Sequence, residues 1–516
     1  MSSPVPLRKE KKLPMPAAPA ALGMASSYYT FSILSSFCGG GVYLLALALF
    51  ILLVIVNFLR VLRVLPGGNA ANQKALITAL AVSVGFTLGI AARRTVHNTP
   101  ELGLDPERII SVSGVLKEDP RTLHGGPGLA VLELKGCGGE GGLRASARGN
   151  LTVFFPEETI PKLKTFGRGA EIFADGIFTK QTESHGGALF RAASLHITKP
   201  APAPEQFRTG LRMALLERFQ SRQESKYEIT YKTPVWGSLA SALLLGVRDN
   251  LDTDLDYGFR NSGCSHVLAL SGMHLAIISS LLAFLLKKPL GLRWASLAGA
   301  VFIAFYIFVA GSQPSLVRAG IMYLIGTISV WGFLKAKPIN LLGMAFIIQL
   351  VFQSESGVSI SFILSYLALA GILGLGESLR SVLRGRLPDV VNSGLSASLG
   401  AFVVTAPVVV FYFGAVRPIG ILASLLIAPL SSLFMVLALG ALTASFLPLP
   451  LWAIFDLVLT GLYRLLEFIV SFFGRLPGLS FSNPFPVLIF SILFYLAALF
   501  IQRRDRLYRS SIASFD

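Results

Sequence analysis

Residues 263–276 read Gly-Cys-Ser-His-Val-Leu-Ala-Leu-Ser-Gly-Met-His-Leu-Ala and open an apolar segment that continues to Leu286. A polar group in hydrocarbon costs free energy unless it finds a partner or lines a wet cavity. The imidazoles and hydroxyls of this stretch therefore indicate either capping of a membrane helix or a polar pathway at its mouth. His266, Ser271 and His274 are the candidate residues for such a gate.

The composition outside this stretch is that of a membrane protein. Hydrophobic residues make up 53% of the 516 residues, charged residues 14%, and the mean hydropathy is +0.65. Several apolar runs approach the roughly 20 residues that span a bilayer. We expect a polytopic α-helical membrane protein of about 12 spans with an inserted extracytoplasmic small β-barrel domain, OB-like in type.

The expected spans alternate with short basic loops. They are residues 21–38, 42–59, 75–92, 266–286, 294–310, 316–334, 339–352, 358–376, 395–413, 419–446, 451–473 and 486–502. The span 419–446 is long and contains Pro429, so it could be kinked, broken or re-entrant.

Most of the positive charge lies in the membrane part. The net charge is +17, and residues 93–232 contribute only +4 of it. The positive-inside rule produces such an excess without a functional demand, and it places both termini in the cytoplasm and residues 93–204 outside the inner membrane.

Residues 93–204 change to period-two alternation and predict a β-domain. Five strands are expected, at residues 109–116, 129–134, 143–155, 170–178 and 189–197. A five-stranded barrel of the OB type and a generic β-domain fit this pattern equally well. Phe154, Phe155, Phe173 and Phe178 could stack on bases, although Phe at strand spacing is more often core.

The remaining chain divides into four further parts. Residues 1–20 predict a disordered cytoplasmic tail, 21–92 the N-terminal transmembrane helices, 205–260 amphipathic interfacial helices and 261–502 a transmembrane channel domain, followed by a basic cytoplasmic tail at 503–516. Within 205–260, residues 206–225 are amphipathic and 236–247 are too short to span comfortably.

Two arginines stand in unusual positions. Arg248 follows Leu-Leu-Leu-Gly-Val and precedes Asp249; pairing with Asp249 or Asp254 is the simpler interpretation, and ligand contact the alternative. Arg318 lies just inside a span, after Gln313-Pro314, where an arginine must face a cavity, a partner or a phosphate. An arginine that snorkels to the interface is the alternative.

Other polar groups support weaker hypotheses. Ser361 and Ser365 share a helix face and could bond a neighbouring helix. Ser271 and His274 lie at i and i+3, which suggests the hypothesis of an intramembrane hydrolase. No nucleophile elbow or orienting acid accompanies them, which argues against it. A small-solute transporter would use an acidic residue such as Asp456 or Glu467 for ion coupling. It would also predict internal repeats, and none is visible in the sequence. Cys38, Cys137 and Cys264 lack metal-ligand spacing, so no metal or cofactor is expected.

Five motifs in this order resemble the ComEC competence family. They are Leu244-Leu245-Gly246-x-Arg248, His266 with Ser271-Gly272-x-His274, Ser315-x-x-Arg318-Ala319, Phe362-x-Leu364-Ser365 and the segment around Pro429. The resemblance implies an inner-membrane channel that admits one DNA strand during natural transformation. The Asp-Pro that often precedes the Phe-x-Leu-Ser segment in the family is replaced by Gln353-Ser354-Glu355-Ser356.

The resemblance also sets the expected partners. The chain has no His-x-His-x-Asp-His motif, which implies a short form without the metallo-β-lactamase-like domain of many members, and no Walker A loop. Single-stranded DNA, membrane lipids, a DNA receptor, a separate ATP-driven motor and a separate nuclease are the expected partners, and homo-oligomerisation is left open. Phosphate contact is expected from Arg248 and Arg318, and pathway support from Gly272, Asp249, Gln313, Ser361, Ser365 and Pro429.

Overall fold

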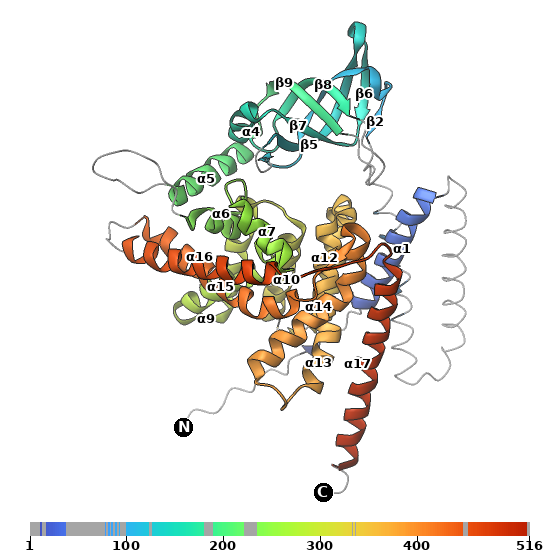
Figure 1. Ribbon diagram of the computed structural model, residues 1–516, viewed down its shortest axis with the longest axis vertical. Helices are drawn as coiled ribbons and strands as arrows, with labels where there is room; N and C mark the ends of the chain where they lie inside the picture. Colours follow the sequence, from blue (N-terminus) through green and yellow to red (C-terminus); the bar gives the residue numbers. More distant parts are fainter. Residues whose placement is uncertain are drawn as a thin grey trace.

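A computed structural model gives the fold. It describes residues 11–12, 17–37, 100–122, 126–179, 189–220, 235–332, 334–335, 337–446 and 452–512, with isolated positions between 78 and 92. The expected span at 42–59, most of the span at 75–92 and Cys38 lie outside the described residues. Figure 1 shows the β-domain above a bundle of helices, with α5 (Ala203–Gln220) leading from one to the other.

The β-domain is a mixed sheet in which all five expected strand segments occur. The strands are β2 (Glu101–Leu102), β3 (Ile109–Leu116), β4 (Arg121–Thr122), β5 (Gly128–Gly139), β6 (Arg144–Arg148), β7 (Asn150–Phe155), β8 (Glu171–Thr179) and β9 (Leu189–Lys199). The expected strand 143–155 divides into β6 and β7 because Gly149, at a φ of +99°, turns the chain between them.

Five strands of the β-domain pair in a cyclic order. β3 pairs antiparallel with β5 and β8, β8 pairs antiparallel with β9, β9 lies parallel to β7, and β7 pairs antiparallel with β5. The helix α4 (Ile160–Phe166) connects β7 to β8. Alternate residues such as Val112, Leu132 and Leu151 are fully buried and form the core that the period-two pattern predicts.

Helices, most of them apolar, make up nearly all of the rest of the described chain. They are α1 (Ala17–Phe37), α6 (Gly237–Leu245), α7 (Thr253–Asn261), α8 (Ser265–Leu268), α9 (Gly272–Ala310), α10 (Pro314–Trp331), α11 (Pro338–Phe352), α12 (Ile360–Gly371), α13 (Glu377–Val382), α14 (Asp389–Phe413), α15 (Gly420–Ala444), α16 (Trp452–Gly474) and α17 (Phe485–Ile512). Seven apolar segments among the described residues are long enough to cross a membrane. The protein is therefore a multi-pass membrane protein, and the count of twelve spans stays a prediction.

Two expected spans form the arms of one bent helix. Residues 266–286 and 294–310 fall largely within α9, which turns at Gly291, where φ is +75°. A side chain at such a φ would be strained, and Pro289 just before it removes a backbone donor. The two arms consequently lie as a hairpin, with their outer ends at Gly272 and Ala310.

Three smaller differences from the sequence predictions concern helix and tail boundaries. α15 runs uninterrupted from Gly420 to Ala444 past Pro429, so the helix is not broken at this proline. The helix begins one residue later and ends two residues earlier than the expected span 419–446. Within the expected disordered tail, Lys11–Lys12 pair in parallel with Leu334–Lys335 and α1 already begins at Ala17.

Candidate functional site

The first turn of α9 is capped by the two residues that the sequence singled out. The backbone N–H of Ser271, the N-cap, donates to Nδ1 of His274 over 3.0 Å. Because Nδ1 accepts, the ring proton lies on Nε2. His274 is fully buried, and its Nε2 has no partner within the described part of the chain. A buried donor without an acceptor therefore sits at the start of this helix.

Arg318, one turn into α10, is a buried cation. Its side chain is 8% exposed, NH1 donates to the backbone carbonyl of Ser365 on α12, and the guanidinium lies 5.6 Å from the centre of the Tyr366 ring. Nε has no hydrogen-bond partner, and no Asp or Glu among the described residues forms an ion pair with Arg318. Among the described residues, the contacts of this positive charge are a carbonyl and a ring face.

Gly272 brings these two groups to the same helix end. A Cβ at Gly272 would lie 3.2 Å from NH2 of Arg318 and 3.3 Å from Cβ of Ala319. The absence of a side chain at Gly272 leaves room for the guanidinium beside the first turn of α9. The Ser-Gly-x-His motif and the Arg-Ala motif thus meet in space, as a helix-mouth cluster of Ser271, Gly272, His274 and Arg318.

A second layer of hydrogen bonds fixes the helices around this cluster. The Tyr366 hydroxyl donates to Oε1 of Gln349 over 2.8 Å, and Nε2 of Gln349 donates to the Pro314 carbonyl over 3.0 Å. Oγ of Ser315 donates to the Leu270 carbonyl over 2.5 Å. Sequence reasoning missed Gln349, although a buried amide within the apolar helix α11 was a visible signal.

Arg248, His266 and Gln313 lie outside this cluster. Arg248 is half-buried and has no ion-pair partner among the described residues; burial lowers the pKa of its guanidinium, and the charge of Asp256 opposes that shift. His266 on α8 is exposed; desolvation lowers the pKa of its imidazole, and a backbone hydrogen bond with Gly263 opposes that shift. Nε2 of Gln313 would lie 3.0 Å from a Cβ at Gly246.

The supporting residues have different surroundings. Asp249 does not pair with Arg248: it forms an ion pair with Lys164 of the β-domain at 2.6 Å and accepts the Thr122 backbone N–H at 3.2 Å. Ser365 joins the cluster through its carbonyl rather than its hydroxyl. Ser361 and Pro429 are both exposed, and neither is among the contacts of Arg318.

The geometry gives little support to catalysis. Oγ of Ser271 lies 3.3 Å from Nδ1 of His274, but the same nitrogen already accepts the Ser271 backbone N–H, so capping accounts for the pair. Burial raises the pKa of the Cys264 thiol to about 11, which keeps it protonated and unreactive near neutral pH. No cluster of three or more His, Cys, Asp or Glu suited to a metal occurs among the described residues.

The acidic residues considered for ion coupling have structural partners. The indole N–H of Trp236 donates to Oδ1 of Asp456 over 2.7 Å. Glu467 pairs with Arg464, an exposed neighbour on the same helix, at 3.0 Å. Neither carboxylate contacts the helix-mouth cluster. The described residues therefore do not place either of these acids beside the buried Arg318, where ion coupling would need one.

A second group of arginines joins the β-domain to the helices. Asp119, between β3 and β4, binds Arg208 and Arg212 of α5, and Arg208 also binds Glu205. Burial alone would raise the pKa of the Asp119 carboxyl, but the hydrogen bond from Arg208 and the charges of Arg212 and Arg208 hold it below its usual range. We call Asp119, Glu205, Arg208 and Arg212 the interdomain latch; sequence reasoning missed it because its partners are distant in the chain.

Comparison with known proteins places the helices in a family. A family model described as Competence protein matches residues 243–504, just over half of the chain. The chain is 26% identical to ComE operon protein 3 of Bacillus subtilis strain 168 over 267 residues, which are 49% of this chain and 32% of that protein. It is 26% identical over 264 residues to an uncharacterized protein of Aquifex aeolicus strain VF5, covering 51% of this chain and 59% of that protein.

The uncharacterized protein YcaI of Escherichia coli strain K12 matches a shorter stretch, 28% identical over 108 residues, or 19% of this chain and 14% of that protein. The matched segment covers less than two thirds of each of these three relatives. No solved structure matches the chain. The family match includes α9 to α15, and these helices hold the helix-mouth cluster. The chain belongs to the Competence protein family, which is the ComEC family that its motifs resemble.

Proposed function

We propose that the chain is an inner-membrane channel that takes up single-stranded DNA during natural transformation, with Arg318 contacting the phosphate backbone. One observation carries the proposal: Arg318 is 8% exposed among membrane helices and has no carboxylate partner among the described residues. A buried charge without a counter-charge is costly, and such residues mark sites where an ion or substrate supplies the missing charge.

The donors around Arg318 suit an anion. Nε of Arg318 and Nε2 of His274 are both buried donors that lack an acceptor among the described residues. Arginine forms strong charge-assisted hydrogen bonds with phosphate, and a helix N-terminus such as that of α9 also favours negative charge. Phosphate contacts position a strand without reading its sequence, which is the property that general DNA uptake needs.

We also propose that the β-domain is an OB-like barrel. The cyclic pairing order β3-β5-β7-β9-β8, the parallel β7–β9 pair and the helix α4 between β7 and β8 support it. Of the four phenylalanines considered for stacking, Phe155 is core, Phe154 and Phe178 are half-buried, with Phe178 packed edge-on against Phe190, and Phe173 is the most exposed. Any base stacking by this domain would therefore involve Phe173.

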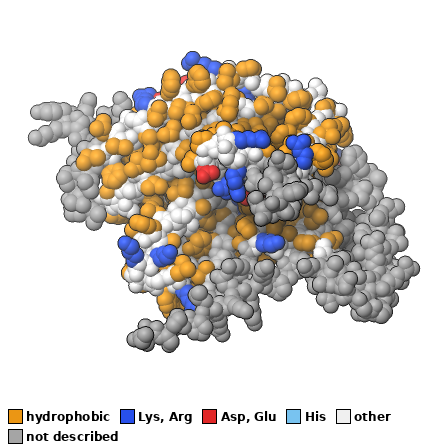
Figure 2. Space-filling view, turned by 90° about the horizontal axis from the view of Figure 1, so that it is seen from below, with side chains coloured by type: hydrophobic (Ala, Val, Ile, Leu, Met, Phe, Trp, Pro, Cys, Tyr) orange, Lys and Arg blue, Asp and Glu red, His pale blue; other side chains and the backbone are white. Residues whose placement is uncertain are grey.

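The distribution of charge supports the expected orientation and domain layout. Figure 2 shows the molecule from below, where lysine and arginine are far more prominent than acidic side chains among the described atoms. By the positive-inside rule this face is cytoplasmic and the β-domain extracytoplasmic. We propose the divisions 93–204, 205–260, 261–502 and 503–516 as expected, an N-terminal helical part that already begins with α1 at Ala17 instead of at residue 21, and a separate receptor, motor and nuclease as partners.

The test is DNA uptake in a naturally competent host. Deleting the gene should abolish transformation and leave added DNA accessible to external nuclease, whereas Arg464→Gln, which removes an exposed helix charge, should behave as the wild type. Purified protein should bind single-stranded oligonucleotides with an affinity that falls steeply with salt. Normal transformation in the deletion strain would overturn the proposal.

A further inference from the structure

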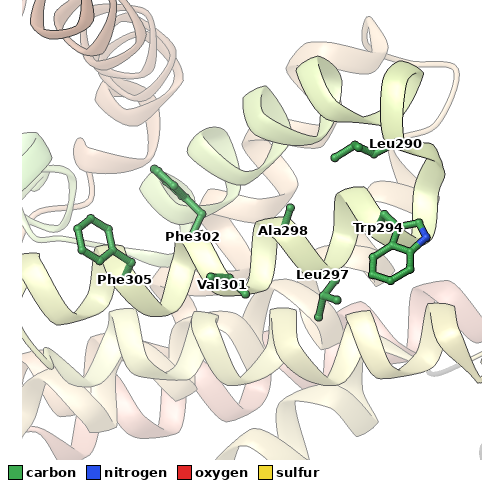
Figure 3. A pocket seen from close by; sticks show the side chains of 7 residues that line it. All are labelled: Leu290, Trp294, Leu297, Ala298, Val301, Phe302 and Phe305. Atoms are coloured by element: carbon green, nitrogen blue, oxygen red, sulfur yellow. The ribbon is translucent and has the colours of Figure 1, made fainter. Parts of the chain in front are cut away.

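An apolar hollow of about 630 Å³ lies along the second arm of α9 and reaches Leu290 at the end of the first arm. Figure 3 shows Leu290 contributed by the first arm and Trp294, Val301, Phe302 and Phe305 by the second. These side chains remain exposed, with 60% of Trp294 and 65% of Val301 accessible. An exposed apolar hollow on a membrane helix faces lipid chains rather than water.

Cations surround the bend at the end of this hollow. The sequence from Lys287 to Arg293 reads Lys-Lys-Pro-Leu-Gly-Leu-Arg and holds no acidic residue. Lys287 and Lys288 are exposed and have no ion-pair partner among the described residues. Arg293 is exposed directly before Trp294, a lining residue. The apolar surface is therefore continuous with a positively charged rim.

The bend lies at the membrane face away from the β-domain. Ser312, just beyond the second arm, accepts a hydrogen bond from Arg168 of the β-domain at 3.0 Å, so the outer ends of the arms lie near that domain. At 1.5 Å per residue each arm is about 28 Å long, close to the ~30 Å hydrocarbon core. Trp294 packs edge-on against Trp331, as in the aromatic belt at a bilayer surface.

We propose that this elbow site, the hollow with its rim of Lys287, Lys288 and Arg293, binds an anionic glycerophospholipid. An acyl chain occupies the hollow along the second arm, and the headgroup phosphate lies at the basic rim. The apolar cavity and the adjoining cluster of cations match the two chemical parts of an anionic amphiphile, whereas a second protein copy that packed through the same elbow would bring like charges to the rim. Basic pockets between membrane helices bind anionic headgroups in this way.

The test uses the full-length protein purified from membranes and reconstituted with equal amounts of phosphatidylglycerol and phosphatidylcholine. Mass spectrometry of the lipid that stays bound after detergent washing should show severalfold enrichment of phosphatidylglycerol. Adding phosphatidylglycerol should raise the apparent melting temperature, because a ligand that binds the folded state stabilises it.

Two variants separate the headgroup from the chain. Lys287→Gln with Lys288→Gln should abolish the preference for phosphatidylglycerol while retaining bound lipid. Val301→Trp, which adds volume at the most exposed lining position, should lower the retention of both lipids. The matched control, Arg384→Gln with Arg386→Gln, removes two charges from the loop between α13 and α14 and should leave the preference unchanged.

Three results would overturn the elbow site. The first is equal retention of the two lipids by the wild type, and the second is an unchanged preference in the double lysine variant. The third is a cross-link between Val301→Cys residues of two copies in the lipid-containing sample, which would show that protein covers the hollow. If Val301→Trp does not fold, Ala298→Leu fills the same hollow with a smaller side chain.

Discussion

The interdomain latch and the helix-mouth cluster both bury arginines, but they treat the charge in opposite ways. Arg208, 3% exposed, binds the carboxylates of Asp119 and Glu205. Arg318, 8% exposed, binds a carbonyl and a ring face and has no carboxylate among the described residues. A complete set of partners is typical of a structural contact, whereas an uncompensated charge is typical of a site that awaits an anion.

The largest expected effect is on DNA uptake, when the uncompensated charge of Arg318 is removed. Arg318→Met keeps much of the side-chain volume and removes the charge. Loss of charge-assisted phosphate bonds worth about 3 kcal/mol should reduce transformation roughly a hundredfold. The apparent melting temperature should stay constant or rise, because the variant no longer buries an unpaired charge.

Transformation frequency, normalised to protein level in the membrane, measures the first effect, and a thermal scan in detergent measures the second. Arg464→Gln is the control for removing one positive charge. If Arg318→Met lowers the melting temperature and uptake in parallel, the arginine is structural and the contrast with the latch disappears.

The latch should show the reverse response, with a large loss of stability. Asp119→Asn leaves Arg212 without its carboxylate and Arg208 with Glu205 alone, which should cost roughly 3 kcal/mol of unfolding free energy. The neighbouring exposed pair Glu118–Arg121 provides a matched control, since Glu118→Gln should cost well under ~1 kcal/mol.

Stability measured against pH tests the same carboxylate. Because the pKa of Asp119 is lowered in the folded state, its contribution is full above the ordinary pKa of about 4 and is lost as the pH falls through the lower folded value. Asp119→Asn should therefore lose stability at pH 7 and show a shallower acid dependence than the wild type. If stability falls with pH in the same way in the variant and in the wild type, the Asp119 carboxylate contributes nothing to the stability of the folded state.

His274 should have an intermediate effect that depends on which nitrogen is replaced. His274→Asn retains an acceptor near the position of Nδ1, preserves the cap on Ser271 and removes the Nε2 donor. Loss of one neutral hydrogen bond, worth about 1 kcal/mol, should lower uptake roughly fivefold at unchanged stability. His274→Gln should lose stability instead, and uptake unaffected by the asparagine variant would assign His274 to capping alone.

The smallest effect is expected from a single methyl group. In Gly272→Ala the new Cβ would lie 3.2 Å from NH2 of Arg318, so the guanidinium must shift by a few tenths of an ångström. Uptake should fall about two- to threefold, within the range of a displaced hydrogen bond. Gly326→Ala on α10, where nothing lies within 4 Å, is the control. Equal uptake in the two variants would place Gly272 outside the pathway.

The fold was predictable where the pattern is local. Hydrophobic periodicity placed β3 at residues 109–116 and α11 within one residue of the predicted 339–352. It failed at Gly149 and Gly291, because a positive φ turns the chain without changing the apolar pattern around it. The cluster was predictable in part: the two motifs gave Ser271, His274 and Arg318, but not the bonds of Gln349 and Tyr366 that fix them.

By itself the sequence determined the membrane class, the inserted β-domain and the residue types at the mouth of α9, since hydropathy and periodicity depend only on neighbours in the chain. The tertiary structure alone decided which charges are compensated. Arg208 and Asp119 are 89 residues apart, Arg318 and Ser365 47 apart, and Asp249 pairs with Lys164 instead of its neighbour Arg248. Ion pairing depends on distances of a few ångströms between helices and strands, and these are set by packing rather than by order in the chain.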